Sequence, residues 1–195
     1  NKRVIYQIDF LINNSKQKFL FPTGKYVLLG RENQNMWNDY NAATRDFQKA
    51  VSFLVKDLGM TEGIDILVQG VADALGNQTF SDTLVKYYDN EYFEKVIYHT
   101  LDQRSNSFIG HSQLLINKTY NNPQLANLRG QFILEALKPK VSPSIQDKLI
   151  LYKGEVTKNV TQDDRYAVIL LAIDWKMVKS AAKKYQEKLN KKVVK

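Results

Sequence analysis

The sequence contains no cysteine among its 195 residues. Disulfides and thiolate metal sites are therefore excluded, and cysteine chemistry gives no indication of the compartment. Long apolar runs are missing too: no stretch reaches the about 18 residues of a membrane-spanning helix, and residues 1–10 lack the layout of a signal peptide. Because the chain also begins without Met, we expect any export signal or membrane anchor to lie in a segment outside this sequence.

Histidine is scarce, and its placement argues against catalysis. His99 and His111 are the only two, and neither is followed by a second histidine or a cysteine three or four positions further on. A Ser-His-Asp constellation and a Gly-x-Ser-x-Gly elbow are both missing from the sequence. We therefore predict a protein that is not an enzyme, with no metal and no cofactor.

Positive charge is unevenly distributed. The formal net charge is +8, but residues 175–195 hold eight lysines against the single acidic residue Glu187, so the rest of the chain is close to neutral. A nucleic-acid-binding fold would spread its charge over a groove-binding surface, and we therefore exclude nucleic acid as the partner. The basic segment is typical of a solvated helix face, with contact to an anionic wall polymer or a membrane surface as the alternative.

The hydrophobic pattern of the first half alternates strand and helix signals. With 44% hydrophobic and 25% charged residues, the chain has the composition of one soluble domain. Alternation from Val4 to Phe10 predicts a strand, and apolar residues at three- and four-residue steps predict a helix over 39–58 that ends at Gly59. The β-branched run 64–68 predicts a strand that leads into a turn-prone segment, 69–76.

The second half repeats the alternation. Asn122 and Pro123 favour a helix start, with Asn122 as the N-cap, and Pro139 follows the helix end. Residues 149–152 and 166–173 predict two strands, and a final amphipathic helix begins at Trp175. The order β-α-β-(insert)-α-β-β followed by a C-terminal basic helix predicts an α/β (α+β) two-layer sandwich, with residues 1–174 as one domain, an insertion over 77–121, and the basic helix over 175–195.

Two motifs in this order resemble those of the OmpA-like family of peptidoglycan-binding domains. Residues 70–76, Gly-Val-Ala-Asp-Ala-Leu-Gly, match its Gly-x-x-Asp-x-x-Gly pattern, and residues 122–130 match Asn-x-x-Leu-Ser-x-x-Arg-Ala at Asn, Leu and Arg. Residues 164–168 lie where the family has Asn-Arg-Arg-Val-Glu. The departures are Val71 and Ala72 in place of His or Tyr and Thr, Ala126 in place of Ser, and Tyr166 in place of the second Arg.

The resemblance implies a binding site for the diaminopimelate stem peptide of peptidoglycan. Diaminopimelate ends in an ammonium and a carboxylate on one carbon, so Asp73 would accept from the ammonium and the fork of Arg129 would bind the carboxylate. Seven residues separate Asn122 from Arg129, so both project from one helix face. We expect the remaining site residues to line the pocket or let main chain approach the ligand: Leu125, Gly70, Gly76 and Ala72.

Each of the three polar site residues also has a purely structural interpretation. Arg129 beside an apolar stripe is also typical of an arginine that extends to the surface and pairs with any carboxylate. Asp73 after a strand is also typical of a turn residue, and Asn122 of a helix cap without ligand contact.

The insertion over 77–121 is the least family-like segment. Apolar and aromatic residues from Leu84 to Ile97 suggest a helix, and 114–116 a short strand. Tyr87, Tyr88, Tyr92 and Phe93 could form a wall or lid that contacts sugar or a partner, although tyrosines at helical spacing more often pack a core.

The sequence thus predicts a non-catalytic module that anchors an envelope protein or complex to the cell wall, in the periplasm and associated with the outer membrane, as in a lipoprotein. Membrane contact is expected only through a segment outside this chain. The alternative is a protein-protein interaction module of an envelope assembly, with a degenerate site and with the 77–121 insertion as the binding surface; Val71 and Ala72 favour it. A wall hydrolase is a more distant third.

Overall fold

The computed structural model describes residues 3–7, 19–21, 24, 26, 45, 47–60, 62–74, 95–114, 120–161 and 164–193. Over these residues the chain is a mixed α/β structure with helices packed on a curled, seven-stranded sheet. The strand order is β1-β7-β3-β6-β4-β5, and β2 pairs with the beginning of β7. The predicted fold class is confirmed.

The strands follow one another across the sheet in a mixed arrangement. β3 is antiparallel to β7 and parallel to β6, and β7 is antiparallel to β1. Central strands β3 and β7 are buried along most of their length, as their near-continuous apolar sequences predict. The strand bounds are β1 Arg3–Gln7, β2 Phe19–Leu20, β3 Ile64–Ala72, β4 Lys95–Asp102, β5 Ser107–Leu114, β6 Leu149–Val156 and β7 Tyr166–Asp174.

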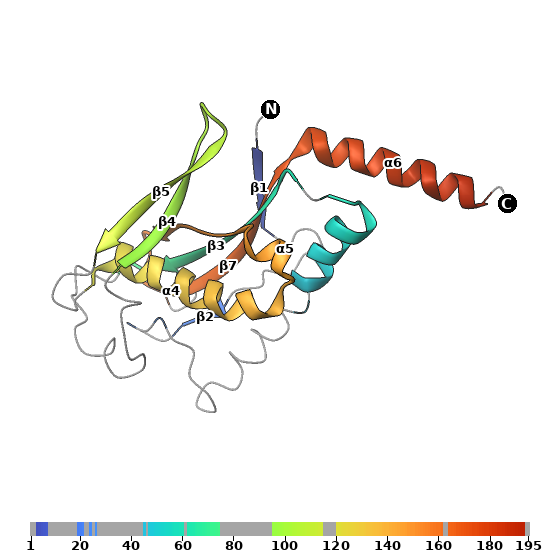
Figure 1. The fold of residues 1–195 in the computed structure, drawn as a ribbon. Helices are drawn as coiled ribbons and strands as arrows, with labels where there is room; N and C mark the ends of the chain where they lie inside the picture. The colour runs from blue at the N-terminus through green and yellow to red at the C-terminus, as the bar shows by residue number, and fades with distance from the viewer. Residues whose placement is uncertain are drawn as a thin grey trace.

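The helices occupy positions close to those predicted. Residues 47–52 are α-helical and continue into the π-helix η2 (Phe53–Asp57), so the helix expected over 39–58 is confirmed where it is described. Next come α4 (Asn122–Leu137), the short helices η5 (Lys138–Lys140) and α5 (Pro143–Gln146), and α6 (Trp175–Val193). Figure 1 shows α4 lying across the sheet and α6 extending away from the end of β7.

Helix α4 lies unusually close to the sheet because small residues face each other at the contact. A Cβ placed on Gly70 of β3 would lie 1.9 Å from the carbonyl oxygen of Ala126 in α4. A Cβ on Gly130 would lie 2.6 Å from Leu151 Cδ1, and one on Gly154 of β6 would lie 2.6 Å from Ala126 Cβ. Gly70 also marks a register shift between β3 and β6. Gly70 therefore admits the helix, and our expectation that it lets main chain approach a ligand is wrong.

The segment Gln69–Gly76, expected as a turn, is largely strand. β3 continues through Gln69 and Gly70 to Ala72, because its pairing with β7 extends to Gly70 and that with β6 to Ala72. The loop therefore begins only at Asp73, and Gly76 lies outside the described residues. The predicted strand over Val4 to Phe10 is confirmed for β1, with its last residues also outside the described part.

The insertion contributes a β-hairpin. Strands β4 and β5 pair along their whole length from Lys95↔Leu114 to Asp102↔Ser107, and β4 joins the sheet at His99↔Tyr152. Val96 and Ile97, expected at the end of a helix, are therefore strand residues, whereas Leu84 to Phe93 lie outside the described part of the chain. The strand expected at 114–116 is described only at Leu114, the last residue of β5.

The curl of the sheet brings the hairpin tip to the opposite edge strand. Arg3 of β1 forms an ion pair with Asp65, and its guanidinium lies 5.3 Å from the ring centre of Phe108 in β5. The backbone N–H of Arg3 donates to Asn106 Oδ1 at 2.8 Å. The β1 end of the sheet thus holds the tip of the inserted hairpin.

Candidate functional site

Three charged residues from distant parts of the sequence meet at one end of the sheet. Asp73 follows the last residue of β3, Arg129 lies midway along α4, and Arg165 directly precedes β7. Arg165 donates from Nε to Asp73 Oδ2 at 2.8 Å, and its Nη2 lies 2.8 Å from the same oxygen. Burial lowers the pKa of Arg129, and the negative charge of Asp73 opposes that shift. Arg129 reaches the same end of β3, because its Nη1 donates to the carbonyl oxygen of Val71, two residues before Asp73, and we call these three residues the charged cluster.

Arg129 lies beneath the surface of the cluster. It is 0% exposed, and its Nη1 donates to the carbonyl oxygen of Val71 at 2.7 Å. Its guanidinium carbon lies 5.4 Å from the ring centre of Phe21, within the range of a cation–π contact. The pKa of Arg129 is lowered to about 10, mainly by burial and to a smaller extent by Arg165, while Asp73 and Tyr120 act in the opposite direction. Arg129 is therefore still a cation at neutral pH.

Asp73 and Arg165 form the outer part of the cluster. Their side chains retain 6% and 11% exposure, whereas Arg129 has none. The group that a ligand would meet first is therefore the Asp73–Arg165 ion pair. An incoming ammonium would compete with Arg165 for the Asp73 carboxylate, and an incoming carboxylate would compete with Asp73 for the guanidinium of Arg165.

The backbone around Asp73 is held from two sides. Asn122 Nδ2 donates to the Asp73 carbonyl oxygen at 3.0 Å, as expected for a residue that orients nearby backbone. On the other side the loop after β6 contributes two bonds: Thr157 N–H donates to Ala72 O at 2.9 Å, and Ala74 N–H donates to Asn159 O at 3.0 Å. The position of the Asp73 carboxylate is thereby fixed relative to α4 and the sheet.

Asn122 is not the helix cap. Asn121 is the N-cap of α4 and forms a capping box with Gln124, in which each side chain accepts from the other residue's backbone N–H. Asn122 is instead the first helical residue, followed by Pro123. Its amide is thus available to Asp73, and our prediction of the cap position is wrong by one residue.

Two further predicted site residues are core residues. Leu125 is 1% exposed and Ala72 is 0% exposed, and both belong to the hydrophobic cluster between α4 and the sheet. The spacing that places Leu125 between Asn122 and Arg129 also turns it toward the sheet. It therefore packs the core and does not line a pocket, and Ala72 contributes backbone only.

The sequence prediction missed Arg165 of the cluster and Phe21, whose ring contacts Arg129. Arg165 was noted within the segment 164–168 that resembles the family's last-strand motif, so a signal existed. Phe21 carried no motif; it reaches Arg129 because its backbone N–H donates to Arg165 O at 2.7 Å, directly after β2 pairs with β7. Tyr166, at the next position, has its pKa raised by burial, then by Glu155 and Asp164.

Both histidines lie in the hairpin and have structural partners. His99 Nδ1 lies 3.3 Å from Leu151 O, and His111 Nε2 lies 2.8 Å from Thr100 Oγ1. The ring of His111 stacks on that of Tyr98 with centres 5.3 Å apart. Across the described ranges, no group of three or more histidines and carboxylates is placed to hold a metal ion.

Comparison of this chain with protein-family models, with curated proteins and with solved structures found no match. Among the described residues, no helix is both long and apolar enough to cross a membrane. Interpretation of the charged cluster therefore rests on its own chemistry. One carboxylate and two guanidinium groups are suited to holding a charged ligand.

Proposed function

We propose that this chain is a non-catalytic peptidoglycan-binding domain that anchors an envelope protein or complex to the bacterial cell wall. The observation that supports the proposal most is the meeting of Asp73, Arg129 and Arg165 at one end of the sheet, from positions 56 and 36 residues apart in sequence. The diaminopimelate head group has the complementary pair of charges, an ammonium and a carboxylate on one carbon.

The roles follow from the exposure of each group. Asp73 accepts from the ligand ammonium, because it is the carboxylate of the cluster and its main chain is fixed by Asn122. Arg165, the more exposed guanidinium, binds the ligand carboxylate first. Arg129 lies behind them as a buried positive charge that donates to Val71 O. Such charge-assisted contacts contribute about 1.5 to 3 kcal/mol each.

Sedimentation with purified sacculi tests the proposal. Asp73→Asn preserves side-chain size and Arg165→Gln keeps a polar, uncharged side chain. Each removes one ionic partner, and we expect each to weaken pelleting about tenfold or more. Glu135→Gln is the matched control, because it removes the ion pair with Lys138 at 2.6 Å on α4, away from the cluster. Melting curves of all variants verify that each is folded.

Two outcomes contradict the proposal. One is equal pelleting by the wild type, Asp73→Asn and Arg165→Gln, and the other is a folded wild type that does not pellet. Calorimetry with a diaminopimelate-containing stem peptide and with its lysine-containing counterpart then measures the contribution of the terminal carboxylate, which lysine lacks.

A second candidate function is favoured by the complete burial of Arg129. An internal Asp73–Arg165 pair over a sealed arginine also suits a structural cluster in a protein-protein interaction module of an envelope assembly. The binding surface would then be the β4–β5 hairpin, whose exposed apolar residues include Ile97, Ile109 and Leu114. This candidate is supported if the wild-type protein does not pellet with sacculi but binds an envelope protein through the hairpin.

A further inference from the structure

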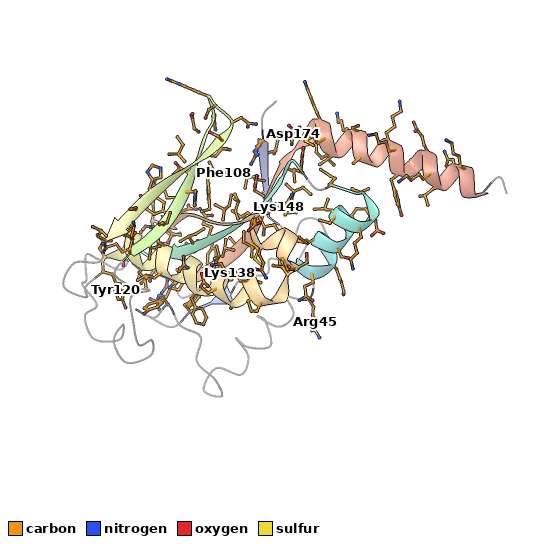
Figure 2. All side chains as sticks on the ribbon, in the orientation of Figure 1. Arg45, Phe108, Tyr120, Lys138, Lys148 and Asp174 are labelled. Atoms are coloured by element: carbon orange, nitrogen blue, oxygen red, sulfur yellow. The ribbon has the colours of Figure 1, made fainter. Side chains whose placement is uncertain are left out.

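Helix α6 is joined to the domain at one end. Asp174 caps it by accepting from the N–H groups of Lys176 and Met177 at 3.0 and 3.3 Å, and the Asp174 N–H donates to Gly63 O at 2.8 Å. The residues of α6 that pack against the hydrophobic core are Val178 and Ala181, in its first two turns. Figure 2 shows Asp174 where β7 passes into α6, with the remaining turns extending outward. A helix of 19 residues is about 28 Å long.

An apolar stripe runs along α6 beyond the point where the helix leaves the domain. Its members follow one another at steps of three and four residues, which places them on one face of the helix. Trp175 and Leu189 are 45% and 38% exposed. The stripe consists of Trp175, Val178, Ala182, Tyr185 and Leu189.

The rest of the α6 surface is basic. The helix carries seven lysines and one acidic residue, Glu187, and the first six lysines are exposed. Lys179 Nζ lies 5.7 Å from the ring centre of Trp175, so this lysine borders the apolar stripe. A narrow apolar face flanked by lysines, with an aromatic residue at its edge, is the pattern of a helix that lies in the plane of a membrane surface.

We propose that α6 binds the surface of an anionic lipid bilayer. The stripe residues other than Val178, which packs against the core, enter the boundary between headgroups and acyl chains, and the lysines reach the headgroup phosphates. This membrane contact lies within the chain, where the sequence indicated a membrane surface only as an alternative to a solvated helix face. It does not depend on the wall-binding proposal, because it uses none of the charged cluster.

Charge distinguishes this partner from the other possible occupants of the stripe. A second copy of α6 would bring seven lysines against seven, with one acidic residue in each helix to offset them, whereas helix pairs in coiled coils match opposite charges beside the seam. An anionic polymer would attract the lysines but would leave the apolar stripe in water. An anionic bilayer offers acyl chains to the apolar stripe and negative charge to the lysines.

Vesicle flotation of the full chain tests the lysines. We expect binding to mixed phosphatidylcholine–phosphatidylglycerol vesicles and about 100-fold weaker binding after combined Lys183→Gln, Lys184→Gln and Lys188→Gln, since each lysine near an anionic surface contributes about fivefold. The matched control removes the same charge elsewhere, through Lys56→Gln, Lys153→Gln and Lys158→Gln, all exposed positions outside α6. This control should float like the wild type, and so should Asp73→Asn.

Fluorescence of Trp175 tests the apolar stripe. In a Trp37→Phe background Trp175 is the chain's one tryptophan, and its emission should shift to shorter wavelength on addition of anionic vesicles. Leu189→Gln should remove most of the binding, and Leu189→Met should retain it, because methionine keeps the apolar contact.

Four outcomes overturn the proposal. The first is an absence of vesicle binding, and the second is equal binding to vesicles of phosphatidylcholine alone. The third is a concentration-dependent dimer, lost in Leu189→Gln, in a chain that does not float with vesicles. The fourth is binding to polyphosphate that depends on the lysines and not on Leu189, again without flotation.

Discussion

At the scale of single residues, Gly70 determines how closely α4 approaches the sheet. Its position in β3 would place a Cβ 1.9 Å from Ala126 O and 2.6 Å from Gly130 N, both of them backbone atoms of α4. Backbone atoms cannot move aside as a flexible side chain can. A side chain at position 70 therefore forces the helix and strand apart. Because α4 carries Arg129 and β3 leads to Asp73, the same displacement separates the members of the charged cluster.

We therefore expect Gly70→Ala to lower the free energy of unfolding by about 3 kcal/mol or more, the upper range for overpacked cores. Urea titration measures the change. Gly110→Ala in the edge strand β5 is the control, since its Cβ would meet no atom closer than His99 Nε2 at 3.4 Å, and its stability should change by less than about 1 kcal/mol. Equal stability of Gly70→Ala and the wild type would contradict the close contact.

The sequence predicted which elements carry Asp73 and Arg129, but it did not predict that Arg129 is buried. Asp73 and Arg129 each lie within a recognisable motif. Those motifs are on β3 and α4, whose hydrophobic patterns are clear, and α4 packs on β3. Burial of Arg129 depends on Phe21, which lies 108 residues earlier in the chain and carries no motif. Long-range side-chain contacts of this kind leave no local periodicity, so a pattern-based prediction has no signal for them.

At the scale of elements, the sequence predicts those with one buried face and one strong period. β3, α4, β7 and α6 each have a continuous apolar run or a helical stripe, and each lies where it was expected. The β4–β5 hairpin was missed because it lies at the sheet edge, and six of the eight residues of β5 are exposed. Without a buried face, alternation of apolar and polar residues has no physical reason to appear.

The hairpin tip depends on Arg3. It is held by the ion pair of Arg3 with Asp65 and the contact of Arg3 with Phe108, while β4 meets the sheet at His99↔Tyr152. In Arg3→Ala we expect backbone amides of residues 102–109 to exchange with deuterium faster, with β3 and β7 unchanged. Global stability should fall by about 1 kcal/mol or less, because both contacts are partly solvated.

Arg104→Ala is the control for this measurement. Arg104 is an exposed residue of the same hairpin turn, and its bond to Asp102 is made by the backbone N–H, which alanine retains. The exchange of residues 102–109 should therefore match the wild type. Identical exchange in Arg3→Ala and Arg104→Ala would show that the curl of the sheet holds the tip without Arg3.

At the scale of the whole molecule, the charged cluster and α6 lie at opposite ends of the same two strands. β3 begins beside the root of α6, where Asp174 N–H donates to Gly63 O, and ends at the cluster, where Asp73 meets Arg165. β7 runs the other way, from Arg165 to Asp174. At about 3.3 Å per residue, the nine residues of β3 separate the two regions by roughly 30 Å.

This separation leads to a prediction that neither region makes alone. If the cluster binds wall and α6 binds lipid, one molecule should hold both at once, since the two surfaces face different ends of the sheet. Fluorescent anionic vesicles should sediment with sacculi when the wild type is present. The Asp73→Asn variant should coat vesicles without bringing them to sacculi, and the triple lysine variant should bind sacculi without vesicles.

Sedimentation of vesicles by an equimolar mixture of these two variants separates true bridging from self-association. In a monomeric bridge each molecule needs both functional ends, so the mixture should fail. Success of the mixture would show that separate molecules associate to join wall and membrane, and would reject the bridge within one chain. Failure of the wild type, with each single binding intact, would show that the two ends exclude one another.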